Sequence, residues 1–135
     1  MTEKIKILKT IHLAICAGVI ITYFMLGEFS NETLKIPVLD SSSIVYAIIP
    51  FIAILLSNFL FKSFLKKVDQ DLTLEEKLPT YQTASVIRWG ILEGAAFIIL
   101  FLKPEFVLFG VLVIVYLIFL RPTEDKIASD LQVNF

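Results

Sequence analysis

A carboxylate lies in the middle of one of the most apolar stretches of this chain. In IRWGILEGAAFIILFL, residues 87–102, Glu93 is nine residues from both Ala84 and Leu102. In a helix rising about 1.5 Å per residue, Glu93 is then about 13 Å from either end, near the middle of a bilayer. An ionisable group at that depth marks a functional site by default, here one that binds and releases a proton or cation. The structural alternative is a protonated Glu93 that bonds to a backbone carbonyl or to Asn58 and locks the helices together.

Three further polar side chains are expected at one level, about one or two helical turns nearer the cytoplasm than Glu93. They are His12 in the first apolar segment, Asn58 in the second and Arg88 in the third. For His12 and Asn58 a structural role near the water-accessible interface is the stronger interpretation. Arg88 is close enough to the inner face to reach lipid phosphates or the cytoplasm. Together with Glu93 these residues form the candidate ion or proton site.

The remaining residues do not have the types and spacing of a reactive site. The sequence holds no cluster of metal ligands, no Ser-His-Asp or Cys-His set and no glycine-rich phosphate loop. Its one cysteine, Cys16, lies in an apolar segment and can form no disulfide within the chain. A net charge of -1, without a basic stretch interleaved with aromatic residues, argues against nucleic-acid binding. We therefore expect no enzymatic activity, no metal and no cofactor.

The composition indicates which elements must position these residues. Hydrophobic residues make up 57% of the 135, and the mean hydropathy is +0.83, which indicates an integral membrane protein. Each apolar segment approaches the roughly 20 residues that cross a bilayer. We expect an all-α protein, one domain over residues 1–135, with four transmembrane helices. The expected spans are 10–27, 44–61, 84–102 and 106–120.

The lysines and arginines are distributed unevenly around these spans and predict their orientation. With a cytoplasmic N-terminus, Arg88 lies at the inner end of its span, and only Lys35 and Lys103 lie outside. The inner side then holds Lys4, Lys6, Lys9, Lys62, Lys66, Lys67, Lys77, Arg121 and Lys126. This asymmetry predicts both termini in the cytoplasm and suits the inner membrane of a bacterium.

Two short interfacial helices are expected outside the spans. In the 62–83 loop, TLEE at 73–76 has the capping-box pattern, and Pro79 is expected to restart the chain into the third span. In the C-terminal tail, Ile127 and Leu131 are four residues apart in a polar stretch. Packing at the membrane edge is the stronger interpretation of both segments, and a docking surface for a partner is the other.

Small residues predict where the helices approach one another closely. They form small-x-x-x-small pairs at Ala14 and Gly18 and at Gly90 and Gly94. Glu93 lies about 60° around its helix from Gly90, so we expect it to face a neighbouring helix. In the second segment Pro50 removes a backbone hydrogen bond and is expected to kink the helix.

Two stretches resemble subunits of ATP synthase. SNFLF at the end of the second segment and WGILEGAAF in the third, with four spans, are similar to the subunit I family, whose members accompany assembly of the rotor ring. QTASVIRWGILEGA, with Gln82 and Glu93 eleven residues apart, resembles the ion-carrying helix of subunit c. The first segment lacks the dense glycine repeat of that family. As a whole the chain is similar to small uncharacterised four-helix membrane proteins of bacteria.

These observations lead to two expectations of function from different classes. The first is an accessory or assembly subunit of a larger membrane complex, whose partners are the lipid bilayer and either other membrane subunits or further copies of the chain. The alternative is a small proton- or cation-coupled carrier that acts as a homo-oligomer with Glu93 as the coupling carboxylate. Four spans with one membrane carboxylate also resemble the small multidrug transporters, although theirs lies on the first helix.

Overall fold

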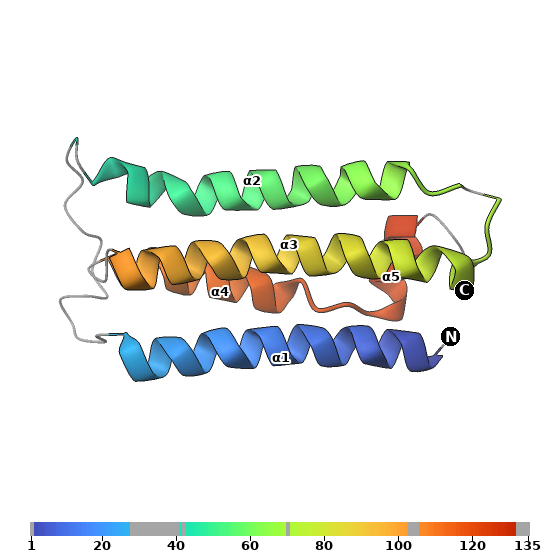
Figure 1. The fold of residues 1–135 in the computed structure, drawn as a ribbon, viewed down its shortest axis with the longest axis horizontal. Coiled ribbons are helices and arrows are strands. Elements are labelled where there is room, and N and C mark those ends of the chain that lie inside the picture. The colour runs from blue at the N-terminus through green and yellow to red at the C-terminus, as the bar shows by residue number, and fades with distance from the viewer. Residues whose placement is uncertain (1, 28–40, 42, 70, 103–105, 132–135) are drawn as a thin grey trace.

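The computed structural model describes residues 2–27, 41, 43–69, 71–102 and 106–131. Within these residues the chain forms five helices and no strand. The helices are α1 (Thr2–Leu26), α2 (Ile44–Lys66), α3 (Leu74–Leu102), α4 (Val107–Phe119) and α5 (Glu124–Leu131). Figure 1 shows α1, α2 and α3 side by side, with α5 at the end of the bundle where α1 and α3 begin and α2 ends. We call this the α5 end.

Helix α3 is the centre of the bundle and packs against all four other helices. Its fully buried side chains recur at intervals of three and four residues, as one face of a helix requires. They include Trp89, Leu92, Ala96 and Ile99. The all-α prediction is confirmed for the described residues.

Three helices are long and apolar enough to cross a membrane, and a fourth crossing is present if α4 and α5 form one bent span. Large apolar side chains on the outer faces of these helices are exposed. Examples are Leu13 (68% exposed), Phe24 (82%) and Leu55 (71%). Such side chains suit contact with lipid far better than contact with water. The chain is therefore a helical bundle compatible with a membrane protein of three or four spans.

The separate interfacial helix predicted in the 62–83 loop is wrong, because α3 begins at Leu74 and continues through Pro79 without a break. The predicted cap at Thr73 is confirmed: its hydroxyl accepts the Glu76 N–H at 3.3 Å. The Glu76 carboxylate accepts a hydrogen bond of 3.0 Å from the same hydroxyl, where a full capping box has it accept the Thr73 backbone N–H. Pro79 removes only the hydrogen bond to the Glu75 carbonyl. Burial of Leu78 and Tyr81 around it keeps the helix continuous.

The last two helices follow the sequence prediction more closely. Helix α4 has 13 residues, a length of about 20 Å compared with the roughly 30 Å of a bilayer core. Helix α5 is bent from it by 87° and buries Ile127 and Leu131, as expected of the tail segment. The predicted outer-loop lysines, Lys35 and Lys103, lie outside the described residues.

Candidate functional site

A polar cluster joins α2, α3 and α4. Arg88 donates from Nη1 to Asn58 Oδ1 at 3.4 Å, and Asn58 donates from Nδ2 to the Tyr116 hydroxyl at 2.8 Å. The Arg88 guanidinium lies over the ring of Phe61, with its Cζ 3.7 Å from the ring centroid. The structure thus brings together Asn58 and Arg88, which the sequence placed at one level. Tyr116 was missed, although it is the single hydroxyl-bearing residue in 106–120.

The Arg88 guanidinium contacts the Phe61 ring and the Asn58 side-chain amide. A guanidinium over an aromatic face is attracted by the ring quadrupole, and the planar group keeps donors free at its edge. Its Nε is buried without a hydrogen-bond partner among the described residues. On the α5 side, Asp130 accepts a hydrogen bond of 2.8 Å from the Tyr81 hydroxyl. A cavity of about 510 Å³ opens beside this cluster, lined by Phe61, Lys62, Leu65, Lys66, Arg88, Ser129 and Asp130.

His12 is separate from this cluster and belongs to the contact between α1 and α4. Its Nε2 is 2.8 Å from the Leu117 carbonyl, to which it donates in the corresponding tautomer. The Cys16 sulfur is 3.5 Å from Nε2, and the Trp89 ring is 4.9 Å away between centroids. His12 is 5% exposed. The predicted layer of His12, Asn58 and Arg88 is therefore divided between two sides of α3.

The end of α4 explains the position of His12. The last four carbonyls of a helix lack the usual i+4 N–H and take other partners. The Leu117 carbonyl accepts the Leu120 N–H at 3.1 Å and has a second lone pair free for a side chain. His12 bonds to the Leu117 carbonyl, and Lys126 donates from Nζ to the carbonyls of Phe119 and Arg121 at 2.7 and 3.2 Å. A cation there also suits the negative end of the helix dipole. His12 and Lys126 thus tie α1 and α5 to the end of α4.

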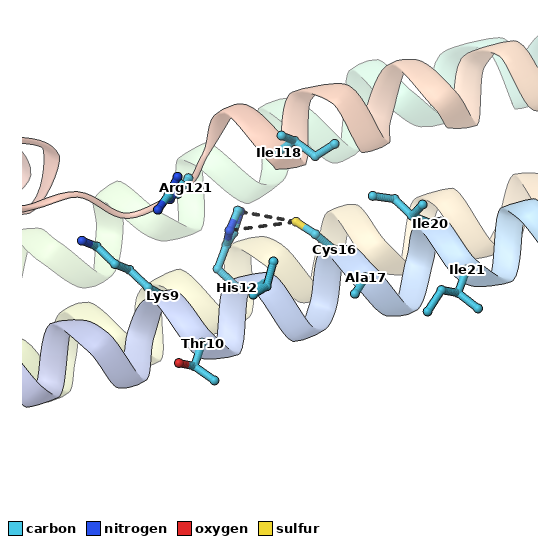
Figure 2. A pocket seen from close by; sticks show the side chains of 10 residues that line it. Lys9, Thr10, His12, Cys16, Ala17, Ile20, Ile21, Ile118 and Arg121 are labelled. Atoms are coloured by element: carbon cyan, nitrogen blue, oxygen red, sulfur yellow. Dashed lines mark hydrogen bonds between the residues drawn. The ribbon is translucent and has the colours of Figure 1, made fainter.

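A larger cavity of about 660 Å³ lies between α1 and α4 (Figure 2). It is lined by Lys9, Thr10, His12, Leu13, Cys16, Ala17, Ile20, Ile21, Ile118 and Arg121. Lys9 and Arg121 lie at one end of the view, and Ile20 and Ile21 lie at the other. Among the described residues no group of three or more His, Cys, Asp or Glu could hold a metal ion.

Glu93 lines neither of these cavities. Its side chain is half-buried on α3, and no hydrogen bond or ion pair joins it to the residues that the structure describes. Asn58, one of the expected partners, bonds to Arg88 and Tyr116 instead. The mid-span carboxylate is therefore unsatisfied within the described chain.

The predicted packing glycines leave open space instead of a helix contact. A Cβ added at Gly18, Gly90 or Gly94 would meet no atom within 4 Å. Ala14 is exposed as well. Gly90 lies about 160° around α3 from the fully buried Leu92, on the face opposite the core. Within the described chain these glycines therefore make no close helix contact, and their packing against another helix stays a prediction. Pro50 is buried inside an uninterrupted α2.

The close helix contact of the bundle is made at Gly110, which the sequence analysis missed. A Cβ at Gly110 would overlap the Tyr23 hydroxyl. That hydroxyl donates a short hydrogen bond to the Ala96 carbonyl, so Tyr23 joins α1 to α3 and α4. Each residue is the only one of its type in its apolar segment, Tyr23 in 10–27 and Gly110 in 106–120. This uniqueness within an apolar segment is the sequence feature that could have identified both residues.

No family model, curated protein or solved structure matches this chain. The resemblance to ATP synthase subunits rests on the short motifs of the second and third segments.

Proposed function

We propose that the protein is an accessory or assembly subunit of a larger membrane complex and binds a partner subunit through the α1–α3 face that carries Glu93. The observation that carries this proposal is an unsatisfied carboxylate beside open glycine positions, midway along a membrane-length helix. We call this surface, formed by Ala14, Gly18, Gly90, Glu93 and Gly94, the Glu93 face.

The small residues of the two helices lie at the same depth. Helices α1 and α3 run in the same direction, with Lys4 paired to Glu75 at 3.7 Å near their start and Tyr23 bonded to Ala96 further along. These partners are 71 and 73 residues apart in sequence, so Gly18 is level with Gly90. Small residues at one depth allow a third helix to approach both backbones closely.

Glu93 then defines the chemistry of the partner. A polar group at the bilayer centre costs a few kcal/mol unless another group satisfies it. The partner we propose is a transmembrane helix with small residues on its contact face and a hydroxyl, amide or basic group at mid-depth. The distribution of lysine and arginine supports an orientation with both termini in the cytoplasm.

Isolation of the tagged protein in a mild detergent tests this proposal. The parent and Val45→Leu, a change at an exposed position of α2, are expected to elute in a complex of defined size that contains other proteins. Gly94→Leu is expected to elute as the free chain while keeping the parent's unfolding temperature. A free parent chain would contradict the proposal, and so would a Gly94→Leu variant that keeps its complex.

The alternative function, a proton- or cation-coupled carrier, is favoured by the same free carboxylate. It requires a homo-oligomer that moves protons in liposomes and loses that transport in Glu93→Gln, which retains shape and hydrogen bonding but cannot release a proton. Transport by the purified chain alone would replace the accessory proposal with this one.

A further inference from the structure

The cavity between α1 and α4 has two chemically different ends. Lys9 and Arg121 lie together at the end nearer the start of α1, and the opposite end is aliphatic (Figure 2). No Asp or Glu is among its lining residues. The ion pair found among the described residues, between Lys4 and Glu75, involves neither cation. Two positive charges therefore converge at this end without a carboxylate to balance them.

The cavity as a whole has about the depth of one membrane leaflet. From Lys9 to Ile21 the lining follows α1 for about 18 Å. Half of a bilayer's hydrocarbon core is about 15 Å. Beyond Cys16 the lining residues on α1 are Ala17, Ile20 and Ile21, and Ile118 of α4 lies opposite Cys16 (Figure 2). The cavity thus matches the depth of one leaflet, with its cations where a headgroup lies.

We propose that this cavity binds an acidic glycerophospholipid, with the headgroup phosphate between Lys9 and Arg121 and one acyl chain along Ala17, Ile20 and Ile118. Basic pockets between membrane helices bind acidic headgroups because lipid phosphate offers both charge and acceptor oxygens. An acidic lipid fills both ends of the cavity, whereas free phosphate leaves the aliphatic end empty. The ligand is therefore the lipid.

The single tryptophan provides a local probe of this cavity. Trp89 is buried, and its ring lies 4.9 Å from that of His12, which lines the cavity. Acyl chains that carry bromine quench tryptophan fluorescence at short range. We would reconstitute the full chain in phosphatidylcholine vesicles and add brominated phosphatidylglycerol or brominated phosphatidylcholine in increasing mole fraction.

The expected result is that brominated phosphatidylglycerol quenches Trp89 at a roughly 25-fold lower mole fraction than brominated phosphatidylcholine, from about fivefold for each of the two cations. Each removed cation should reduce this preference about fivefold, so Lys9→Gln with Arg121→Gln should abolish it. Ala17→Leu, which fills the aliphatic end, should weaken quenching by the acidic lipid without changing the Trp89 emission in unbrominated vesicles.

Lys62→Gln with Lys66→Gln is the matched control, because it removes two cations that line the cavity beside Arg88. The preference should survive in this variant and in millimolar inorganic phosphate. Equal quenching by the two lipids in the parent would overturn the proposal. Loss of the preference only in the Lys62 and Lys66 variant would overturn it in favour of the other cavity, and loss in inorganic phosphate would identify a site for the free ion.

Discussion

At the scale of single residues, two glycines differ in what surrounds them. One packs against another helix of the chain, and the other lies on the surface that we propose binds a partner. Gly110 is in contact with the Tyr23 ring, and Gly94 faces open space. Both occur in apolar helices, and the sequence pattern singled out Gly94 and missed Gly110. The G-x-x-x-G spacing of Gly90 and Gly94 shows that a close approach is possible there, but it does not show which helix makes it.

The first prediction concerns Gly110→Ala. The added methyl group overlaps the Tyr23 ring, and overpacking of this kind typically costs about 1–3 kcal/mol. Gly94→Ala, the matched control, should leave stability unchanged or slightly raised. Reversible unfolding of both variants in detergent and denaturant checks the difference, and equal effects would contradict the assignment.

A second prediction follows from the hydroxyl of Tyr23, the group nearest to the added methyl. Tyr23→Phe should cost about 1 kcal/mol, because it removes the hydrogen bond to the Ala96 carbonyl. In the double variant Gly110→Ala and Tyr23→Phe, the loss should be smaller than the sum of the single losses, since the removed oxygen relieves part of the overlap. Additive losses would mean that Tyr23 moves away from Gly110 freely.

At the scale of elements, helix α3 shows what a local pattern can and cannot predict. The cap at Thr73 was predicted correctly from TLEE, because a capping box involves only neighbouring residues. The break expected at Pro79 was wrong, since burial of Leu78 and Tyr81 by other helices holds α3 together. The position of His12 at the end of α4 also depends on a distant helix, and no local pattern predicts it.

The third prediction concerns this cap. Thr73→Ala removes the hydroxyl that accepts the Glu76 N–H and should destabilise the first turn of α3 by about 1 kcal/mol. Amide hydrogen exchange should become faster around residues 74–78 and stay unchanged after Tyr81, where the buried core begins. Thr73→Ser keeps the hydroxyl and should exchange like the parent. Faster exchange along the whole of α3 in Thr73→Ala would contradict this local role.

At the scale of the whole molecule, composition and apolar segment lengths were enough to predict a helical membrane-compatible bundle. The second and third segments lie inside α2 and α3, and the tail helix is present as α5. Asn58 and Arg88 were placed in one layer from their common depth, but the hydrogen bond between them was not predicted. The depth of a residue in the membrane does not determine which side of its helix faces the core. For this reason the contact of His12 with α4 and the exposure of Gly18, Gly90 and Gly94 could not be predicted from the sequence.

The fourth prediction concerns orientation in the membrane, from the excess of lysine and arginine at one end. A reporter active only outside the cytoplasm should be silent when fused after Phe135 and active when inserted near Asn31. A cytoplasmic reporter at the same two positions serves as the control and should give the reverse pattern. Activity of the external reporter after Phe135 would contradict an arrangement with four crossings.

Photo-crosslinking in intact membranes tests most directly whether the Glu93 face is an interface with another subunit. The photoreactive residue replaces Ile98, an exposed large side chain one helical turn from Gly94, so that the glycines themselves stay unchanged. An adduct of one defined mass with another membrane protein is expected. The adduct should be absent when the photoreactive residue is at Val45, and it should be lost from position 98 in Glu93→Ala. Contradictory results would be lipid adducts alone from both positions, or a protein adduct at position 98 that persists unchanged in Glu93→Ala.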